Sequence, residues 1–267
     1  MVPVVSLEMI FPGYDTVNKI KEISNAGFQH IEFAGWREKD ISGIRGICES
    51  LGIRIVNISG HRRGSIVCPD EHPLFLQDLN ETLEIAAQLK PEYLMFLTNA
   101  LTAEGRVIDS YADIPAEDKV RHSVAALKAA MDIIPEEYTV VLEPLNTLVD
   151  HKGYFLDTPE ETVRILNRLD DKRCRMLCDL YHFGVMGYDL EKLISDYTAR
   201  FAYIHVANFP GRHELKADSN YWTSVLKQLN RCGYNGYIGF EYIPERDSVE
   251  SLRRISDFWR RFSDSQV

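Results

Sequence analysis

The sequence is poor in cysteine and in long apolar runs, and these shortages exclude several classes of protein. Its five cysteines, among 267 residues, are odd in number and scattered along the chain. That usage is typical of free thiols in a reducing compartment and not of a secreted disulfide framework. No segment approaches the run of about 18 apolar residues that a membrane-spanning helix needs. We therefore expect a cytoplasmic protein with no membrane partner.

Positive charge is also in short supply. The chain carries 30 lysine and arginine residues against 40 aspartate and glutamate residues, which gives a formal net charge of −10. Since phosphate contacts require a basic surface, this balance predicts no nucleic-acid partner. The net charge does not exclude a small anionic substrate, because a few arginines at one site can override the net charge of the chain.

A glycine-rich phosphate turn is missing as well. The first apolar run continues into SLEMIFPGYD, residues 6–15, which lacks the glycine pattern of an open, doubly wound dinucleotide-binding sheet. The chain also has no proline- or serine-rich linker and no low-complexity tract. These absences disfavour an open nucleotide-binding sheet and favour a single domain.

What the sequence contains is an alternation of short apolar runs with amphipathic helical segments. Most of the apolar runs are continuous, as expected for parallel strands that are covered on both faces. Eight repeats average about 33 residues each, the size of one βα unit. The sequence therefore predicts an α/β protein, a single (β/α)₈ TIM barrel domain over residues 1–267 with eight strands and eight helices. The apolar runs lie at residues 2–10, 30–36, 53–59, 93–99, 139–146, 175–183, 201–209 and 236–244.

Acidic and imidazole side chains occur at the ends of the last four strand-like runs. Glu143 directly follows Val140–Leu142 in the fifth run, Asp179 lies in the sixth, His205 in the seventh and Glu241 in the eighth. Because parallel strands of a barrel end at the same face, we expect these four side chains to converge there.

This mostly oxygen set suits Mg²⁺, Mn²⁺ or Co²⁺ better than a thiolate zinc site. Any one of these residues alone is more often a salt-bridged or packed residue, but the joint placement predicts a divalent-metal site. A cation would also offset the cost of ending the buried run at Val140–Leu142 in a carboxylate.

Several motifs resemble those of a known family. They resemble the xylose isomerase-like barrel superfamily and, within it, the hydroxypyruvate isomerase-type proteins. The motifs are HIEFAGW (30–36), LEPLNT (142–147), GYFLDTPE (153–160), CDLYHFG (178–184), HVANFPGRHE (205–214), NYW (220–222) and GYIGFEYIP (236–244).

The resemblance implies a role for each site residue. It makes Glu143, Asp179, His205 and Glu241 the metal ligands, and Glu143 and Glu241 also the acid/base pair. It makes His182 and Arg212 substrate-binding residues. The implied reaction is the isomerisation of a small hydroxycarbonyl compound, such as hydroxypyruvate or a related keto acid or sugar acid, through a cis-enediolate.

The loop after the fifth run departs from the family pattern. Family members often carry an arginine–aspartate pair there, whereas this chain has LVDHKGYF at residues 148–155. Since that loop shapes the substrate pocket, the resemblance does not identify the substrate.

A second group of candidate binding residues is His61, Arg62 and Arg63, which follow the third run and are expected at the barrel mouth. There His61 is a further substrate-binding candidate, and the two arginines are candidates for binding an anionic substrate.

Three alternative functions remain at this stage. A ketose 3-epimerase would use the same metal and the same two glutamates. A DNA-repair endonuclease on this barrel would need more histidine ligands and a basic groove, which the net charge disfavours. A sugar-binding barrel without catalysis would not need both glutamates. Barrels of this size often associate, so a homo-oligomer is also an open prediction.

Overall fold

The computed structural model describes residues 1–264, whose eight strands form a closed parallel barrel. Each strand pairs with its neighbours in sequence, and β8 closes the ring by pairing with β1, where Val2 is aligned with Tyr237. The predicted TIM barrel is confirmed; the last three positions of the predicted domain lie outside the described residues. The strands are β1 (Val2–Ser6), β2 (His30–Phe33), β3 (Arg54–Ser59), β4 (Tyr93–Phe96), β5 (Thr139–Leu142), β6 (Cys174–Asp179), β7 (Phe201–Val206) and β8 (Tyr237–Phe240).

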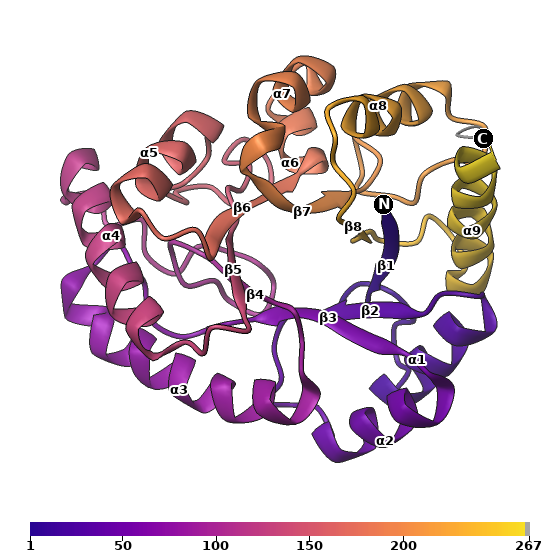
Figure 1. Cartoon of the computed structure of the whole chain (residues 1–267), viewed down its shortest axis with the longest axis horizontal. Coiled ribbons are helices and arrows are strands. Elements are labelled where there is room, and N and C mark those ends of the chain that lie inside the picture. The colour runs from indigo at the N-terminus through magenta and orange to yellow at the C-terminus, as the bar shows by residue number, and fades with distance from the viewer. Residues whose placement is uncertain (265–267) are drawn as a thin grey trace.

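The helices surround the barrel, with the strands on the inside (Figure 1). The prediction of one helix between successive strands is wrong between β6 and β7, where two α-helices occur within the described chain. Asp179 ends β6 and at once caps the first of them by accepting a hydrogen bond from the backbone N–H of Tyr181. The helices are α1 (Thr16–Asn25), α2 (Ile41–Leu51), α3 (His72–Leu89), α4 (Ala116–Ile133), α5 (Pro159–Leu169), α6 (Leu180–Val185), α7 (Leu190–Tyr197), α8 (Asn220–Arg231) and α9 (Ser248–Asp264), with the 3₁₀ helices η1 (Pro69–Glu71) and η2 (Thr198–Arg200).

Two hydrophobic cores explain why the apolar runs are continuous. The larger core lies between strands and helices and includes Ile20, Phe75 and Leu226. The smaller core joins side chains from strands on opposite sides of the ring, among them Val56 and Tyr203, so it fills the barrel interior. Both faces of most strands are therefore apolar, and polar side chains gather at the strand ends.

Several strands are shorter than the apolar runs that predicted them. The run at 236–244 contains β8, which ends at Phe240, yet Tyr242 beyond it is still buried. Residues that follow a strand pack beneath the loops of the barrel mouth, so they are apolar without being extended.

The structure also bears on the expectations about the cysteines and about membrane-spanning helices. All five cysteines, which fall within the described chain, are free thiols, as predicted from their scattered spacing. Along residues 1–264, no helix combines the length and the apolar character that crossing a bilayer requires.

Candidate metal centre and active site

The strand alternation places the four predicted ligands on the barrel axis. Successive side chains of a strand point to opposite faces, so residues two or four positions apart share a face. Each predicted ligand lies two or four positions after a side chain of the interior core, and it therefore points inward at the carboxyl end of its strand. The pairs are Val141 and Glu143, Leu177 and Asp179, Tyr203 and His205, and Tyr237 and Glu241.

The four side chains meet in one cluster at the barrel mouth. Their potential ligand atoms lie within 4.8 Å of one another. His205 Nδ1 lies 3.6 Å from Glu143 Oε1 and 3.5 Å from Glu241 Oε2. Glu143, Asp179 and His205 are buried, whereas Glu241 is partly exposed. The structure brings these residues together; their action as ligands stays a prediction.

Glu32 at the end of β2 orients His205 from the other side. Its two carboxylate oxygens lie 3.0 and 3.1 Å from His205 Nε2, and Asn57 donates a hydrogen bond to the same carboxylate. His205 Nε2 therefore carries the proton, while Nδ1 is buried without a hydrogen-bond partner and faces the carboxylates of Glu143 and Glu241.

Gly239 in β8 makes this pairing possible. A Cβ atom at this position would lie 2.6 Å from Glu32 Oε1 and 2.7 Å from His205 Cδ2, closer than any side chain allows. Since β7 and β8 align His205 with Gly239, only glycine leaves room for the buried Glu32–His205 pair.

Arg212 and His182 stand beside the carboxylates. The Arg212 guanidinium contacts Glu241 directly and lies 3.4 Å from Asp179 Oδ2. It also lies 4.9 Å from the centre of the Tyr181 ring, a cation–π contact. His182 on α6 places its Nε2 3.4 Å from Asp179 Oδ2. Both predicted substrate-binding residues are therefore adjacent to the predicted ligands.

The charges in the cluster are unevenly balanced. Burial raises the pKa of Glu143 to about 7. Burial acts in the same direction on Glu241, but the adjacent Arg212 and His205 together outweigh it and hold the pKa of that carboxyl well below its usual value. Burial alone would lower the pKa of His205, yet the carboxylates around it raise this pKa well above the ordinary value. The cluster thus has an excess of buried carboxylates that a cation would stabilise.

The donor set fits a divalent cation. Three carboxylates and one imidazole supply hard oxygen ligands and a single nitrogen, as Mg²⁺ or Mn²⁺ sites do. The unpartnered Nδ1 of His205 is held toward two of the carboxylates, and a carboxylate on the opposite ring nitrogen is the usual outer support of a histidine ligand. A cation at this position would take the place of a proton on Nδ1.

A comparison with family models settles the family. The model of the xylose isomerase-like TIM barrel matches residues 20–261. The chain belongs to this family.

Relatives and solved structures agree with this assignment. A Xenopus laevis protein named "Putative hydroxypyruvate isomerase" is 27% identical over 258 residues, 92% of each chain. The 2-oxo-tetronate isomerase of Haemophilus influenzae is 22% identical over 254 residues, 92% of this chain and 95% of that relative.

Two solved structures share the fold. One is an AP endonuclease, family 2, from Brucella melitensis, with a TM-score of 0.84, 22% identity and coverage of 94% of this chain and 96% of that one. The other is an L-ribulose 3-epimerase, with a TM-score of 0.79, 16% identity and coverage of 99% and 94%. At these identities the likeness shows the fold alone.

His61 occupies a different part of this xylose isomerase-like barrel. It is buried, its ring packs edge-on against Phe75 and Phe96, and its Nε2 lies 3.1 Å from the carbonyl oxygen of Leu97. Burial lowers its pKa to about 4. Within residues 1–264, its hydrogen bonds and ring contacts do not reach the four predicted ligands, His182 or Arg212, so a binding role for His61 remains only a prediction.

The neighbouring Arg63 pairs with acidic side chains of α3. Arg63 forms ion pairs with Asp78, at 2.5 Å, and with Glu81, at 2.8 Å. Its guanidinium is therefore engaged in holding the loop after β3 to α3. This gives Arg63 a structural explanation that its sequence position did not indicate.

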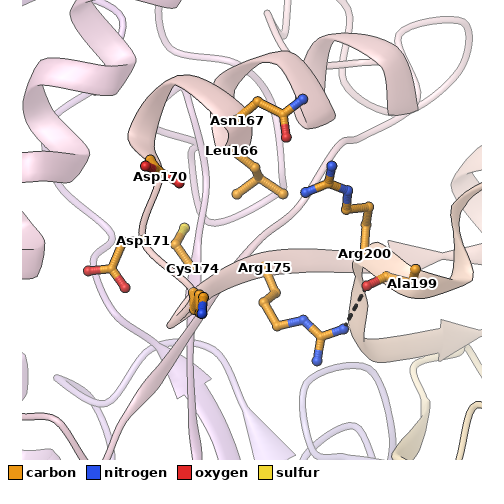
Figure 2. A pocket seen from close by; sticks show the side chains of 9 residues that line it. Leu166, Asn167, Asp170, Asp171, Cys174, Arg175, Ala199 and Arg200 are labelled. Carbon is orange, nitrogen blue, oxygen red and sulfur yellow. Dashed lines mark hydrogen bonds between the residues drawn. The ribbon is translucent and has the colours of Figure 1, made fainter.

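A separate pocket opens at the far end of the barrel. Its cavity of about 390 Å³ is lined by Asn167, Cys174, Arg175 and Arg200, among others, where β6 begins, whereas the cluster of predicted ligands lies where β6 ends. Figure 2 shows the guanidinium groups of Arg175 and Arg200 pointing in different directions, with Arg175 bonded to the carbonyl of Ala199. The two arginines do not form a common anion site.

Sequence reasoning missed three residues of the site. They are Glu32, Gly239 and Asn146, the last of which bonds to His182. Glu32 lies inside the predicted run HIEFAGW (30–36), where a carboxylate next to apolar residues also needs a partner. Its partner, however, comes from β7, and no local pattern indicates that pairing.

Proposed function

We propose that this protein is a divalent-metal-dependent isomerase of a small hydroxycarbonyl compound, such as hydroxypyruvate or a related keto acid or sugar acid. The observation that carries this proposal is the convergence of Glu143, Asp179, His205 and Glu241 within 4.8 Å. The family and the names of two full-length relatives, a "Putative hydroxypyruvate isomerase" and a 2-oxo-tetronate isomerase, support the reaction class.

The four clustered residues would hold Mn²⁺, Mg²⁺ or Co²⁺. When bound, such a cation supplies Lewis-acid polarisation of the substrate carbonyl and stabilises the charge that develops on the substrate oxygens. Asp179 and His205 serve only as ligands in this proposal, and Glu32 keeps the Nδ1 of His205 free for this purpose.

Glu143 and Glu241 also act as the acid/base pair. They approach the cluster from β5 and β8, on either side of His205 Nδ1. One glutamate, as a carboxylate, removes the proton from the hydroxyl-bearing carbon next to the carbonyl. The other, as a carboxylic acid, gives its proton to the former carbonyl carbon of the cis-enediolate, while the substrate hydroxyl proton passes to the former carbonyl oxygen. Positioned proton transfer of this kind contributes about 10²–10⁴-fold to the rate.

Arg212 and His182 would bind the substrate. The planar guanidinium of Arg212 is suited to a carboxylate or a terminal hydroxyl group. Its backbone is held by a hydrogen bond from the N–H of Ile243 to its carbonyl oxygen, which connects the loop after β7 to the segment that follows β8.

His61 remains a further candidate for binding the substrate. The cytoplasmic location and a homo-oligomeric state also remain predictions.

The test is a screen of small hydroxycarbonyl compounds with added Mn²⁺ or Mg²⁺. Glu143→Gln and Glu241→Gln should each lower turnover by at least about 10²-fold, because each removes a proton-transferring group. Glu214→Gln is the matched control, since Glu214 is also buried but pairs with Arg254. Circular dichroism should show that all three variants are folded. Full turnover in either site variant would remove that glutamate from the pair.

A ketose 3-epimerase is the second candidate. Glu143 and Glu241 come from strands on either side of β6 and β7, so they could serve opposite faces of one carbon. Turnover in D₂O separates the two functions. An epimerase incorporates deuterium at C3 of the ketose, whereas an isomerase incorporates it at the carbon of the newly formed C–H bond.

A further inference from the structure

The side chain of Asn146, in the loop after β5, has a fixed orientation. Asn146 is fully buried. Its Oδ1 accepts hydrogen bonds from the backbone N–H groups of Val149 and Asp150, at 3.1 and 3.0 Å. Those two donors leave no choice about which end of the amide is the oxygen. The Nδ2 group must therefore lie on the opposite side, where it contacts Asp150 Oδ2 at 2.7 Å and His182 Nδ1 at 2.6 Å.

This orientation determines the tautomer of His182. An amide NH₂ group donates two hydrogen bonds and accepts none. The Asp150 carboxylate takes one of them, and His182 Nδ1 has to accept the other. His182 must therefore carry its single proton on Nε2, the nitrogen that faces Asp179 Oδ2 at 3.4 Å.

His151 has the opposite arrangement. Its Nδ1 lies 2.6 Å from the carbonyl oxygen of Gly105, and a carbonyl oxygen can only accept. His151 therefore carries its proton on Nδ1. The rings of His151 and His182 contact each other edge-to-face at 5.3 Å, so the loop after β5 and helix α6 bring together one histidine of each tautomer.

A second metal centre is the competing interpretation of this region. Asp150, His151 and His182 offer atoms within 4.8 Å of one another. Hydrogen bonds already use the relevant atoms, however. Asn146 occupies His182 Nδ1, and both Asn146 and Tyr181 donate to Asp150 Oδ2. A hydrogen-bond network explains these contacts without a cation.

We propose that Asn146 is a positioning residue that fixes His182 in the Nε2–H tautomer, so that His182 donates a hydrogen bond to a substrate oxygen and takes no part in proton transfer. The tautomer assignment rests on the hydrogen bonds alone, and the role toward substrate rests on the proposed function. A substrate with a hydroxyl or carbonyl oxygen beside the reacting carbons would accept this hydrogen bond. The bond strengthens as negative charge develops on that oxygen in the enediolate.

The direct test is the ¹⁵N NMR spectrum of the histidine rings in the Mg²⁺-loaded protein, with His182→Gln and His151→Gln used to assign the signals. We expect His182 to show a protonated Nε2 and an unprotonated Nδ1, and His151 to show the reverse. A protonated Nδ1 on His182 in the unmodified protein would overturn the proposal.

Asn146→Asp tests whether the hydrogen bond from Asn146 fixes the tautomer of His182. The new carboxylate keeps an acceptor for Val149 and Asp150 but replaces the donor to His182, so His182 Nδ1 should become protonated. The kcat should fall by about 10²-fold, as for other losses of a preorganised donor, with a smaller change in KM. Unchanged His182 signals in this variant would refute the role of Asn146.

Asn99→Asp is the matched control. Asn99 is equally buried in a mouth loop, accepts a hydrogen bond from the N–H of Phe155 and donates to the carbonyl of Asp109. It should leave the His182 signals unchanged, and altered signals would mean that any buried change at the mouth shifts the tautomer. The NMR result does not depend on turnover. Absence of activity on every hydroxycarbonyl compound would therefore remove the proposed function while leaving the tautomer assignment standing.

Discussion

The imidazole of His205 shows how much of this site depends on a single proton. Glu32 accepts from Nε2–H, and Nδ1 of the same ring is buried without a hydrogen-bond partner. Gly239 provides the space for the pair. The predicted ligand is therefore held by a buried carboxylate from the opposite side of the barrel.

Glu32→Gln should weaken metal binding while the protein stays folded. The amide is a weaker acceptor and carries no charge, so His205 is held less firmly and its nitrogen is less basic. Loss of such an outer partner typically lowers metal affinity by about 10–100-fold. Calorimetric titration with Mn²⁺ measures the change, with Glu214→Gln as the buried-glutamate control. Equal affinity in Glu32→Gln and the unmodified protein would show that Glu32 does not support the site.

The sequence indicated some of these residues and not others for a physical reason. Glu143 and Glu241 stand out because a charge directly after an apolar run is costly unless something pairs with it. Glu32 lies inside its run, between Ile31 and Phe33, and its partner is 173 positions away in the chain. The role of Asn146 depends on which end of its amide faces His182, and a sequence does not specify that.

The connection from β3 to α3 is an element held in place by one buried carboxylate. Asp78 on α3 is fully buried and accepts hydrogen bonds from the backbone N–H groups of Arg62 and Arg63. It also pairs with the side chains of Arg37 and Arg63. The loop that follows β3 is thus fixed to the helix by charge-assisted hydrogen bonds.

Asp78→Asn should lower stability and flatten its pH dependence. Burial favours the neutral acid, but the N–H donors of Arg62 and Arg63 outweigh it and lower the pKa of Asp78. A carboxyl with a lowered pKa stabilises the fold above its unfolded pKa, near 4, and loses that contribution as the pH falls through the folded value. The loss in Asp78→Asn at neutral pH should be about 1–3 kcal/mol.

Urea unfolding between pH 7 and pH 3 measures this effect. The difference in unfolding free energy between the unmodified protein and Asp78→Asn should shrink as the medium becomes acidic. A difference that stays constant over this range would show that Asp78 is not ionised in the folded protein.

The type and order of most helices and strands could be predicted from the sequence, but the residues at which the strands end could not. A threonine followed by a proline is typical of a helix start, and at the start of α5 the Thr158 hydroxyl accepts from the N–H of Glu161 at 3.2 Å. The strand ends were placed too late, because buried residues of the mouth loops are as apolar as strand residues. The short helix α6 was missed because its sequence, LYHFGV, reads as a continuation of β6.

At the scale of the whole molecule, the cluster connects widely separated parts of the ring. Its four residues come from β5, β6, β7 and β8, and Glu32 adds β2. The ring is closed by the pairing of β8 with β1, so the contacts of the cluster join strands from most of its circumference. A cation held by four strands should therefore stabilise the entire barrel and not only its mouth.

Mn²⁺ should raise the midpoint of thermal unfolding and keep a single transition. A ligand that binds only the folded state at 100 times its Kd adds about 2.7 kcal/mol. For a chain of this size, each kcal/mol shifts the midpoint by about 2–4 °C, so the expected rise is about 5–10 °C.

Asp179→Asn should lose most of this rise, since it removes a ligand charge while an asparagine can still cap α6. Glu214→Gln should show the full rise from its own starting midpoint. Differential scanning calorimetry with and without Mn²⁺ makes the comparison, and an equal rise in Asp179→Asn and the unmodified protein would place the cation elsewhere.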